Sequence, residues 1–229
     1  LIGEEHKGMA AMFTMMNAAR LGVGIQGVGV AEAALQQAVA YATERNQMGP
    51  IIRPPDVRRM LATARAEVFA ARAICLACAA AIDLERATGD AEHAARAAFL
   101  TPIAKAYGTD VGWRVADTGV QVHGGMGYVE ETGAAQFLRD VRITQIYEGT
   151  NGIQAMDLVG RKLSDGGDAA MRLLDEILDT AKSTQADHPE LANQVWQAAE
   201  TLREATLSLL ERDLPERFAG ALPFLTAYA

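Results

Sequence analysis

The sequence has few aromatic residues and only two cysteines, and both shortages narrow the range of folds. Aromatic residues make up 6% of the 229 residues, whereas alanine is abundant, and this balance favours close-packed helices over sheets. Cys75 and Cys78 have the spacing C-x-x-C, but no second pair is present to complete a structural zinc site. We therefore expect two small buried residues on one helix face, in a protein of a reducing, cytosolic compartment.

Long apolar runs and clusters of basic residues are missing as well. No segment reaches the roughly 18 apolar residues that a membrane span needs, and no Lys/Arg stripe points to nucleic acid. The four histidines are too scattered to suggest a metal site. The net charge of -8 is uneven, because residues 1–163 hold 16 basic and 17 acidic side chains, whereas residues 164–229 hold 5 and 12. We predict two domains with these bounds, the second an acidic, helical and truncated C-terminal extension.

Apolar residues recur at three- and four-residue spacing along most of the chain, which is the pattern of amphipathic helices. No segment has the pattern of a β-strand, so the sequence predicts an all-α bundle. Helices are expected at residues 9–47, 54–86, 91–122, 133–139, 153–162, 169–184 and 189–212. Asp90 should cap the third of these helices and Pro102 should kink or break it, with a glycine-rich loop following at residues 123–127.

Four glycines, Gly22, Gly24, Gly27 and Gly29, interrupt the first expected helix. Each glycine costs about 1 kcal/mol in a helix interior. Such a cluster needs a compensating reason, and we expect the close approach of another helix or of a ligand.

Residues 142–154, with the sequence RITQIYEGTNGIQ, place a carboxylate among apolar neighbours. Glu148 follows an aromatic residue and directly precedes Gly149. Loss of solvation would make the carboxylate a stronger proton acceptor, and the glycine would let another molecule approach the backbone. A glutamate before a glycine is also common at a helix end or turn, so this pattern alone leaves both interpretations open.

Three segments taken together resemble the C-terminal domain of the acyl-CoA dehydrogenase family. Residues 41–49 (YATERNQMG) are similar to the family's YAxxRxxFG helix end, residues 121–128 (QVHGGMGY) to its QxxGGxGY loop, and residues 146–150 (IYEGT) to its catalytic segment. The resemblance covers about residues 8–163 and implies a four-helix up-and-down bundle. The remaining residues resemble the additional C-terminal helices of longer bacterial members, a group that includes enzymes of methylthiopropionyl-CoA breakdown.

By this resemblance, the complete protein is an FAD-dependent oxidoreductase that converts an acyl-CoA thioester to the trans-2-enoyl-CoA. Glu148 matches the family's catalytic base, which removes the α-proton, and the backbone N–H of that residue typically helps to bind the thioester carbonyl. Some members carry the base on the first long helix instead, at the position of Ala19. Alanine cannot accept a proton, so the resemblance implies the Glu148 arrangement.

The resemblance also implies cofactor and substrate contacts, position by position. The expected FAD contacts are Arg45, Gln47, Met48, Gln121, Gly124, Gly125 and Thr150, and the expected substrate contacts are Asn17, Arg20, Tyr147 and Gly149. A guanidinium suits a pyrophosphate, and glycines give access to backbone N–H groups. Simpler roles stay open for three of them: a helix-end cation for Arg45, a helix-end hydrogen bond for Gln121, and a solvated or ion-paired side chain for Arg20.

Several positions depart from the family's pattern. Met48 replaces a phenylalanine that packs near the adenine, and Asn17 stands where an acid is common. Asn151 and Gly152 replace bulkier residues after the Glu-Gly-Thr segment, which puts one contact on the adenine side in doubt.

The resemblance further implies partners and a larger protein. In the family the flavin contacts serve a neighbouring subunit, so we expect a homodimer or homotetramer in the bacterial cytoplasm, with electron-transfer flavoprotein as the electron acceptor. The family's N-terminal helical domain and middle β-domain have no counterpart here. We therefore expect an excised fragment that folds and self-associates but neither holds FAD tightly nor turns over. An acyl-CoA oxidase domain and a non-catalytic helical oligomerisation module remain as alternatives.

Overall fold

Helices form all the long regular elements of the computed structural model, which describes residues 3–229 and contains no β-strand in that range. The chain divides into two compact units. The first comprises the described residues up to Ala79, Ala104–Asn151 and the last residue, and the second comprises Ala80–Ile103 and Gly152–Tyr228. The prediction of an all-α protein is confirmed.

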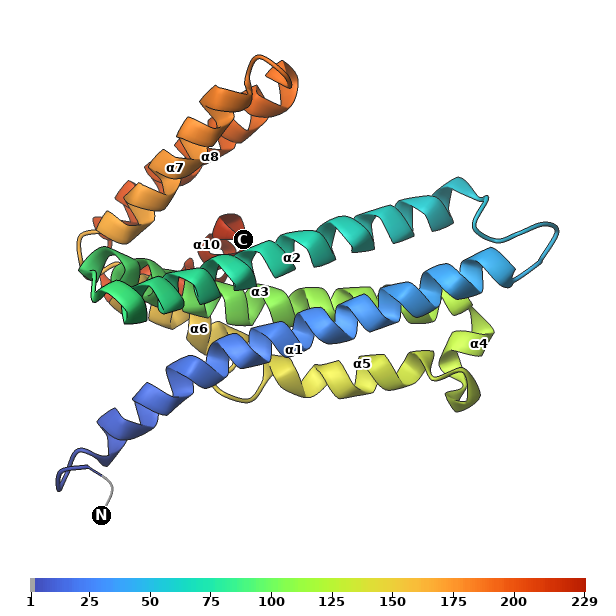
Figure 1. Ribbon diagram of the computed structural model, residues 1–229, viewed down its shortest axis with the longest axis horizontal. Helices are drawn as coiled ribbons and strands as arrows, with labels where there is room; N and C mark the ends of the chain where they lie inside the picture. Colours follow the sequence, from blue (N-terminus) through green and yellow to red (C-terminus); the bar gives the residue numbers. More distant parts are fainter. Residues whose placement is uncertain (1–2) are drawn as a thin grey trace. The chain divides into compact units, whose positions relative to one another are not determined.

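The first unit is built around a long helix, α1 (Gly8–Glu44), and α5 (Ala134–Arg142) runs along it (Figure 1). The first part of α2 (Pro55–Thr88) and the second part of α3 (Ala91–His123) complete the unit. Connecting turns are α4 (Gly125–Tyr128) and the 3-10 segments Glu130–Thr132 and Ile143–Gln145. Small and β-branched side chains of α1, α3 and α5 fill the space between these helices, among them Ala34, Ala116 and Val141.

Two of the four glycines in α1 mark a close contact between helices. A Cβ atom at Gly27 would lie 2.3 Å from the carbonyl oxygen of Gly108, and one at Gly24 would lie 2.6 Å from that of Ala104, so the backbones of α1 and α3 touch. The expectation of a close approach is therefore confirmed for these two positions. At Gly22 and Gly29 an added Cβ would meet nothing within 4 Å, so no neighbouring helix among the described residues explains these two glycines.

The second unit contains most of the C-terminal half of the chain. Its elements after residue 151 are α6 (Asn151–Asp157), a π-helical turn (Leu158–Lys162), α7 (Asp168–Thr184), α8 (Pro189–Leu210), α9 (Leu214–Ala219) and α10 (Ala221–Tyr228). Helices α7 and α8 run side by side as a hairpin, drawn in orange in Figure 1. The hairpin buries Leu174 and Leu178 of α7 against Ala199 of α8.

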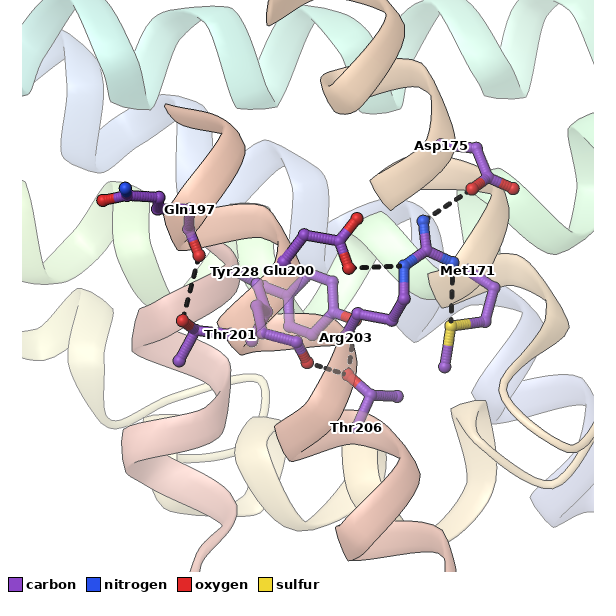
Figure 2. Close-up of polar contacts among 9 residues, drawn as sticks. Met171, Asp175, Gln197, Glu200, Thr201, Arg203, Thr206 and Tyr228 are labelled. Atoms are coloured by element: carbon purple, nitrogen blue, oxygen red, sulfur yellow. Dashed lines mark hydrogen bonds and ion pairs between the residues drawn. The ribbon is translucent and has the colours of Figure 1, made fainter. Parts of the chain in front are cut away.

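Figure 2 shows polar contacts within the hairpin and one that links it to the C-terminal helix α10. Arg203 of α8 donates a hydrogen bond of 2.6 Å to Asp175 of α7 and lies 3.8 Å from the sulfur of Met171. The hydroxyl groups of Thr206 and Tyr228 are 2.8 Å apart. The ring of Tyr228 also packs edge-on against another aromatic ring of the unit, Phe99.

The predictions for Asp90, Pro102 and residues 123–127 had different outcomes. Asp90 caps α3 as predicted, since its carboxylate accepts a hydrogen bond of 2.9 Å from the backbone N–H of Glu92. Of the kink or break expected at Pro102, the break is wrong: α3 continues through this residue, because proline removes a single backbone donor while the surrounding residues, such as Ile103, are buried. The loop expected at residues 123–127 shrinks to Gly124, which has φ 62° and lies between α3 and α4.

The cysteines lie on the buried face of α2, as predicted. Both are buried thiols outside any disulfide, and the sulfur of Cys75 is 3.8 Å from the carbonyl oxygen of Ala104. Burial raises the pKa of the Cys75 thiol to about 12, as expected for a packing residue and not for a reactive one. Among residues 3–229, no three His, Cys, Asp or Glu side chains lie together as metal ligands would. None of the described helices has both the length and the apolar character to cross a bilayer.

Candidate active site

Glu148 lies in a turn between the 3-10 segment Ile143–Gln145 and helix α6, and its backbone is strained. Its φ is 56°, in the left-handed region that glycine favours, and Gly149 follows with φ 87°. A residue with a side chain pays about 1–2 kcal/mol for this conformation, so it persists only where other contacts impose it. The side chain of Glu148 is half-buried.

Two contacts from Lys105 of α3 fix the chain directly after Glu148. The ammonium group donates a hydrogen bond of 2.9 Å to the carbonyl oxygen of Gly149 and one of 2.8 Å to the side-chain oxygen of Asn151. Lys105 has no exposed surface at all. A buried lysine is costly unless its donors are satisfied, so these contacts are tightly constrained.

Asn151, the first residue of α6, is the centre of a wider buried network. Its side-chain amide donates hydrogen bonds of 3.0 Å to the hydroxyl of Thr109 and 2.8 Å to the carboxylate of Asp110. The same carboxylate accepts a hydrogen bond of 2.6 Å from Gln145, just before Glu148. The turn is thus held on both sides of Glu148 by consecutive turns of α3.

Sequence reasoning missed most of this network. It treated Asn151 only as a departure from the family's pattern and did not consider Lys105, Thr109 or Asp110. A usable signal was present, because these three polar side chains interrupt an otherwise apolar stretch of α3 within little more than one helical turn.

Arg20 and Asn17 approach the same region from α1. Arg20 is only 2% exposed, so the alternative of a solvated side chain is wrong. Its guanidinium donates a hydrogen bond of 3.4 Å to the side-chain oxygen of Asn17. Tyr147, next to Glu148, donates its hydroxyl to the side-chain oxygen of Gln26, so α1 also anchors the turn.

The charges around Lys105 show which groups lie together. Burial lowers the pKa of Lys105 to about 8, Asp110 and Glu148 act in the opposite direction, and Arg20 lowers this pKa further. Glu148 and Arg20 are therefore both near the lysine. The expected base and the expected substrate arginine thus lie near the same buried lysine.

A second group of expected residues gathers where α1 and α3 end. The rings of Tyr41 and His123 stack there with centroids 4.2 Å apart, and the imidazole Nδ1 lies 2.7 Å from the carbonyl oxygen of Gly119. This contact joins the two segments that were expected to bind FAD. We call their expected contacts the flavin residues: Arg45, Gln47 and Met48 after α1, and Gln121, Gly124 and Gly125 around the end of α3.

The flavin residues are exposed and fit an anionic dinucleotide. Arg45 ends α1, where its backbone N–H donates to the carbonyl of Tyr41 over 2.8 Å, and its side chain is exposed. An added Cβ at Gly124 or Gly125 would meet nothing within 4 Å, so the backbone there is accessible. Met48 is fully exposed with φ 54°. Thr150, also expected to contact FAD, is exposed beside Glu148.

The family model for the acyl-CoA dehydrogenase C-terminal domain matches residues 6–163. The chain belongs to the acyl-CoA dehydrogenase family. This match spans the Glu148 turn and all the flavin residues, so the family resemblance carried by the three sequence segments is confirmed. Acyl-CoA dehydrogenases are oxidoreductases, and the all-α fold of the chain agrees with their C-terminal domain.

Individual relatives extend the comparison beyond residue 163. The 3-methylmercaptopropionyl-CoA dehydrogenase of Ruegeria pomeroyi is 42% identical over 98% of this chain, which corresponds to 42% of the relative. The structure of butyryl-CoA dehydrogenase from Megasphaera elsdenii is 37% identical with a TM-score of 0.63, over 70% of this chain and 40% of that one. An acyl-CoA dehydrogenase of Bacillus anthracis in complex with FAD shares the fold over 99% of this chain and 42% of that one, with a TM-score of 0.78 and 24% identity. The chain thus spans about two fifths of the length of these relatives.

Proposed function

We propose that this chain is the part of an FAD-dependent acyl-CoA dehydrogenase that carries the proton-abstracting base, Glu148. The observation that supports it most is the strained turn, in which Glu148 has φ 56° and its carboxylate lies near the buried Lys105. Strain of this kind persists where the surrounding structure over-determines it, and it clusters at active sites. The proposed reaction is the desaturation of an acyl-CoA thioester to the trans-2-enoyl-CoA.

In this proposal each residue of the turn has its own role toward the substrate. The carboxylate of Glu148 accepts the α-proton, and its backbone N–H helps to hold the thioester carbonyl as negative charge develops there. Gly149 lets the thioester approach, while Arg20, Asn17 and Tyr147 shape the wall on the α1 side. Bound FAD would supply the oxidant by accepting the β-hydrogen as hydride.

The flavin residues would bind the cofactor in the same proposal. The exposed guanidinium of Arg45 suits the pyrophosphate, and the accessible backbone at Gly124 and Gly125 suits the adenosine half. We propose that they serve a neighbouring subunit of a homodimer or homotetramer in the bacterial cytoplasm, with residues 1–163 as the catalytic bundle and residues 164–229 as its extension. Electron-transfer flavoprotein is the proposed acceptor, and peroxide formation in its place would identify an oxidase.

The test is Glu148→Gln in the full-length protein. Removing a general base should slow exchange of the substrate α-proton with solvent deuterium by about 1,000-fold, while FAD absorbance stays at one equivalent per chain. Glu204→Gln is the matched control, because Glu204 is an exposed glutamate on α8. Butyryl-CoA and 3-methylmercaptopropionyl-CoA serve as substrates. Exchange at the wild-type rate with both would rule out Glu148 as the base.

A further inference from the structure

Lys105 is the most unusual side chain of the first unit, because it is an amine without exposed surface in the middle of a helix. Lysine is rarely buried fully, since its charged form loses the solvation of water. The groups that the ammonium meets are the carbonyl oxygen of Gly149 and the side-chain oxygen of Asn151, which follow Glu148 in the chain. The position of the lysine is therefore best explained through the segment that carries Glu148.

The two acceptors of Lys105 lie on either side of Thr150, immediately after Glu148. They are the carbonyl of Gly149 at 2.9 Å and the side-chain oxygen of Asn151 at 2.8 Å. Glu148 and Gly149 are consecutive residues with positive φ, and the carbonyl that Lys105 binds is that of Gly149. Donation to this carbonyl fixes the peptide that follows the turn, and so limits the directions in which the Glu148 side chain can leave the backbone.

The acceptors are themselves immobilised. Asn151 donates to Thr109 and Asp110, at 3.0 and 2.8 Å, and both belong to the turn of α3 that follows Lys105. Through these bonds Lys105 fixes the irregular segment that carries Glu148 against the buried helix α3. The carboxylate in turn contributes to the electrostatic environment of the ammonium, as Asp110 on α3 and Arg20 on α1 do.

We propose that Lys105 is a positioning residue, which holds the Glu148–Gly149 turn through the Gly149 carbonyl and the Asn151 side chain and thereby sets where the carboxylate meets the substrate. The inference rests on the proposed function of Glu148. In this role Lys105 acts through the turn and not directly on the substrate or the cofactor. Its effect should therefore appear in the rate of proton abstraction and much less in the affinity for acyl-CoA.

The experiment compares Lys105→Met with Lys182→Met in the full-length protein, because Lys182 is an exposed lysine on α7. Lys105→Met keeps the length of the stem and removes both donated hydrogen bonds. A misplaced base loses on the order of 100-fold in rate, so α-proton exchange should slow by about that factor, with KM nearly unchanged and FAD still bound. Lys182→Met should match the wild type.

The pH profile separates positioning from general destabilisation. Burial places the pKa of Lys105 at about 8, with Asp110 and Glu148 raising it and Arg20 lowering it. The wild-type exchange rate should therefore fall as the pH rises through about 8 and the ammonium loses its charge. This limb should be absent from Lys105→Met. A variant with the wild-type rate and the wild-type limb would overturn the proposal.

A second variant covers the case in which Lys105→Met does not fold. Asn151→Ala removes one acceptor and leaves the lysine in place, so it should slow exchange by a smaller factor, and an unchanged rate would count against the proposal. Glu148→Gln distinguishes the two proposals. If exchange survives there, the proposed function fails, whereas loss of exchange only in Glu148→Gln leaves Glu148 as the base and removes the role of Lys105.

Discussion

Two groups of polar side chains, one around Asn151 and one around Arg203, differ in their exposure to water. In the first unit, Lys105, Thr109 and Asn151 are all buried. In the second unit, the ion pair between Arg203 and Asp175 joins side chains that are 24% and 64% exposed. Water competes with the second group and not with the first, so a lost partner should cost more around Asn151.

The two groups also hold different kinds of backbone. Arg203 and Asp175 connect α8 and α7, two regular helices whose backbone groups already bond to one another. Asn151 and Lys105 hold a turn with consecutive positive φ values, which has no regular hydrogen-bond pattern of its own. Apolar packing therefore stabilises the α7–α8 hairpin, whereas buried hydrogen bonds determine the geometry of the Glu148 turn.

The largest effect is expected where packing holds the hairpin. Leu174 has no exposed surface, and it contacts Leu178 and Ala199 between α7 and α8. Leu174→Ala should lower the free energy of unfolding by about 3 kcal/mol, through lost burial and the cavity left behind. Leu191→Ala, at a position of α8 that is 58% exposed, should change it by less than about 0.5 kcal/mol. Urea unfolding measures both changes, and equal losses of stability would contradict the claim that apolar packing at Leu174 holds the hairpin.

An intermediate effect is expected where hydrogen bonds hold the turn. Thr109→Val keeps the shape of the side chain but removes the hydroxyl that accepts from the amide of Asn151 at 3.0 Å. The amide keeps its hydrogen bonds to Asp110 and to the carbonyl of Ala106, so the loss of this one buried bond should lower the free energy of unfolding by about 1.5 kcal/mol. Thr118→Val, on the same helix, removes a hydroxyl whose bond runs to the carbonyl of Arg114 one turn earlier, and should be nearly neutral. Indistinguishable unfolding curves for the two variants would show that the buried network around Asn151 adds nothing to the stability of the fold.

The helices were predictable from sequence because apolar periodicity reports on burial within each segment. Residues 169–184 were expected to be helical and α7 is Asp168–Thr184, whereas the first helix was expected to reach residue 47 and ends at Glu44. The difference lies at the ends, where capping and tertiary contacts decide. The π-helical turn after α6 has no sequence signal of this kind.

The site was predictable only in part, for the same physical reason. Motif similarity selected Glu148, but the left-handed backbone at this glutamate depends on contacts with α3. Lys105 lies 44 residues before Gly149 in sequence, so no local pattern connects the amine with the carbonyl that it binds. A lone lysine in an apolar helix indicates a buried partner without identifying it.

The smallest loss of stability is expected on removal of the hydroxyl of Tyr228, the one aromatic hydroxyl of α10. This loss should also depend on pH. The hydroxyl of Thr206 donates to the carbonyl of Leu202 at 2.7 Å and shares a 2.8 Å hydrogen bond with the phenol of Tyr228, in which either hydroxyl can be the donor. Tyr228→Phe should therefore lower the free energy of unfolding by about 1 kcal/mol at pH 7. Tyr128→Phe, at a position that is 84% exposed, serves as the control and should have no effect.

The pH dependence of this difference follows from burial of the phenol. Burial raises the pKa of Tyr228 from 10.0 to about 12, against the smaller lowering effects of Thr206 and Arg203. Below pH 10 both the folded and the unfolded chain keep the proton, and the full stabilisation is present. Between pH 10 and about 12 the unfolded chain ionises first, so the wild type loses stability that Tyr228→Phe keeps. The advantage of the wild type should therefore shrink and reverse in this range, which unfolding measurements at pH 7 and pH 11 can test; a constant difference would mean that the phenol is as solvated as it is in the unfolded chain.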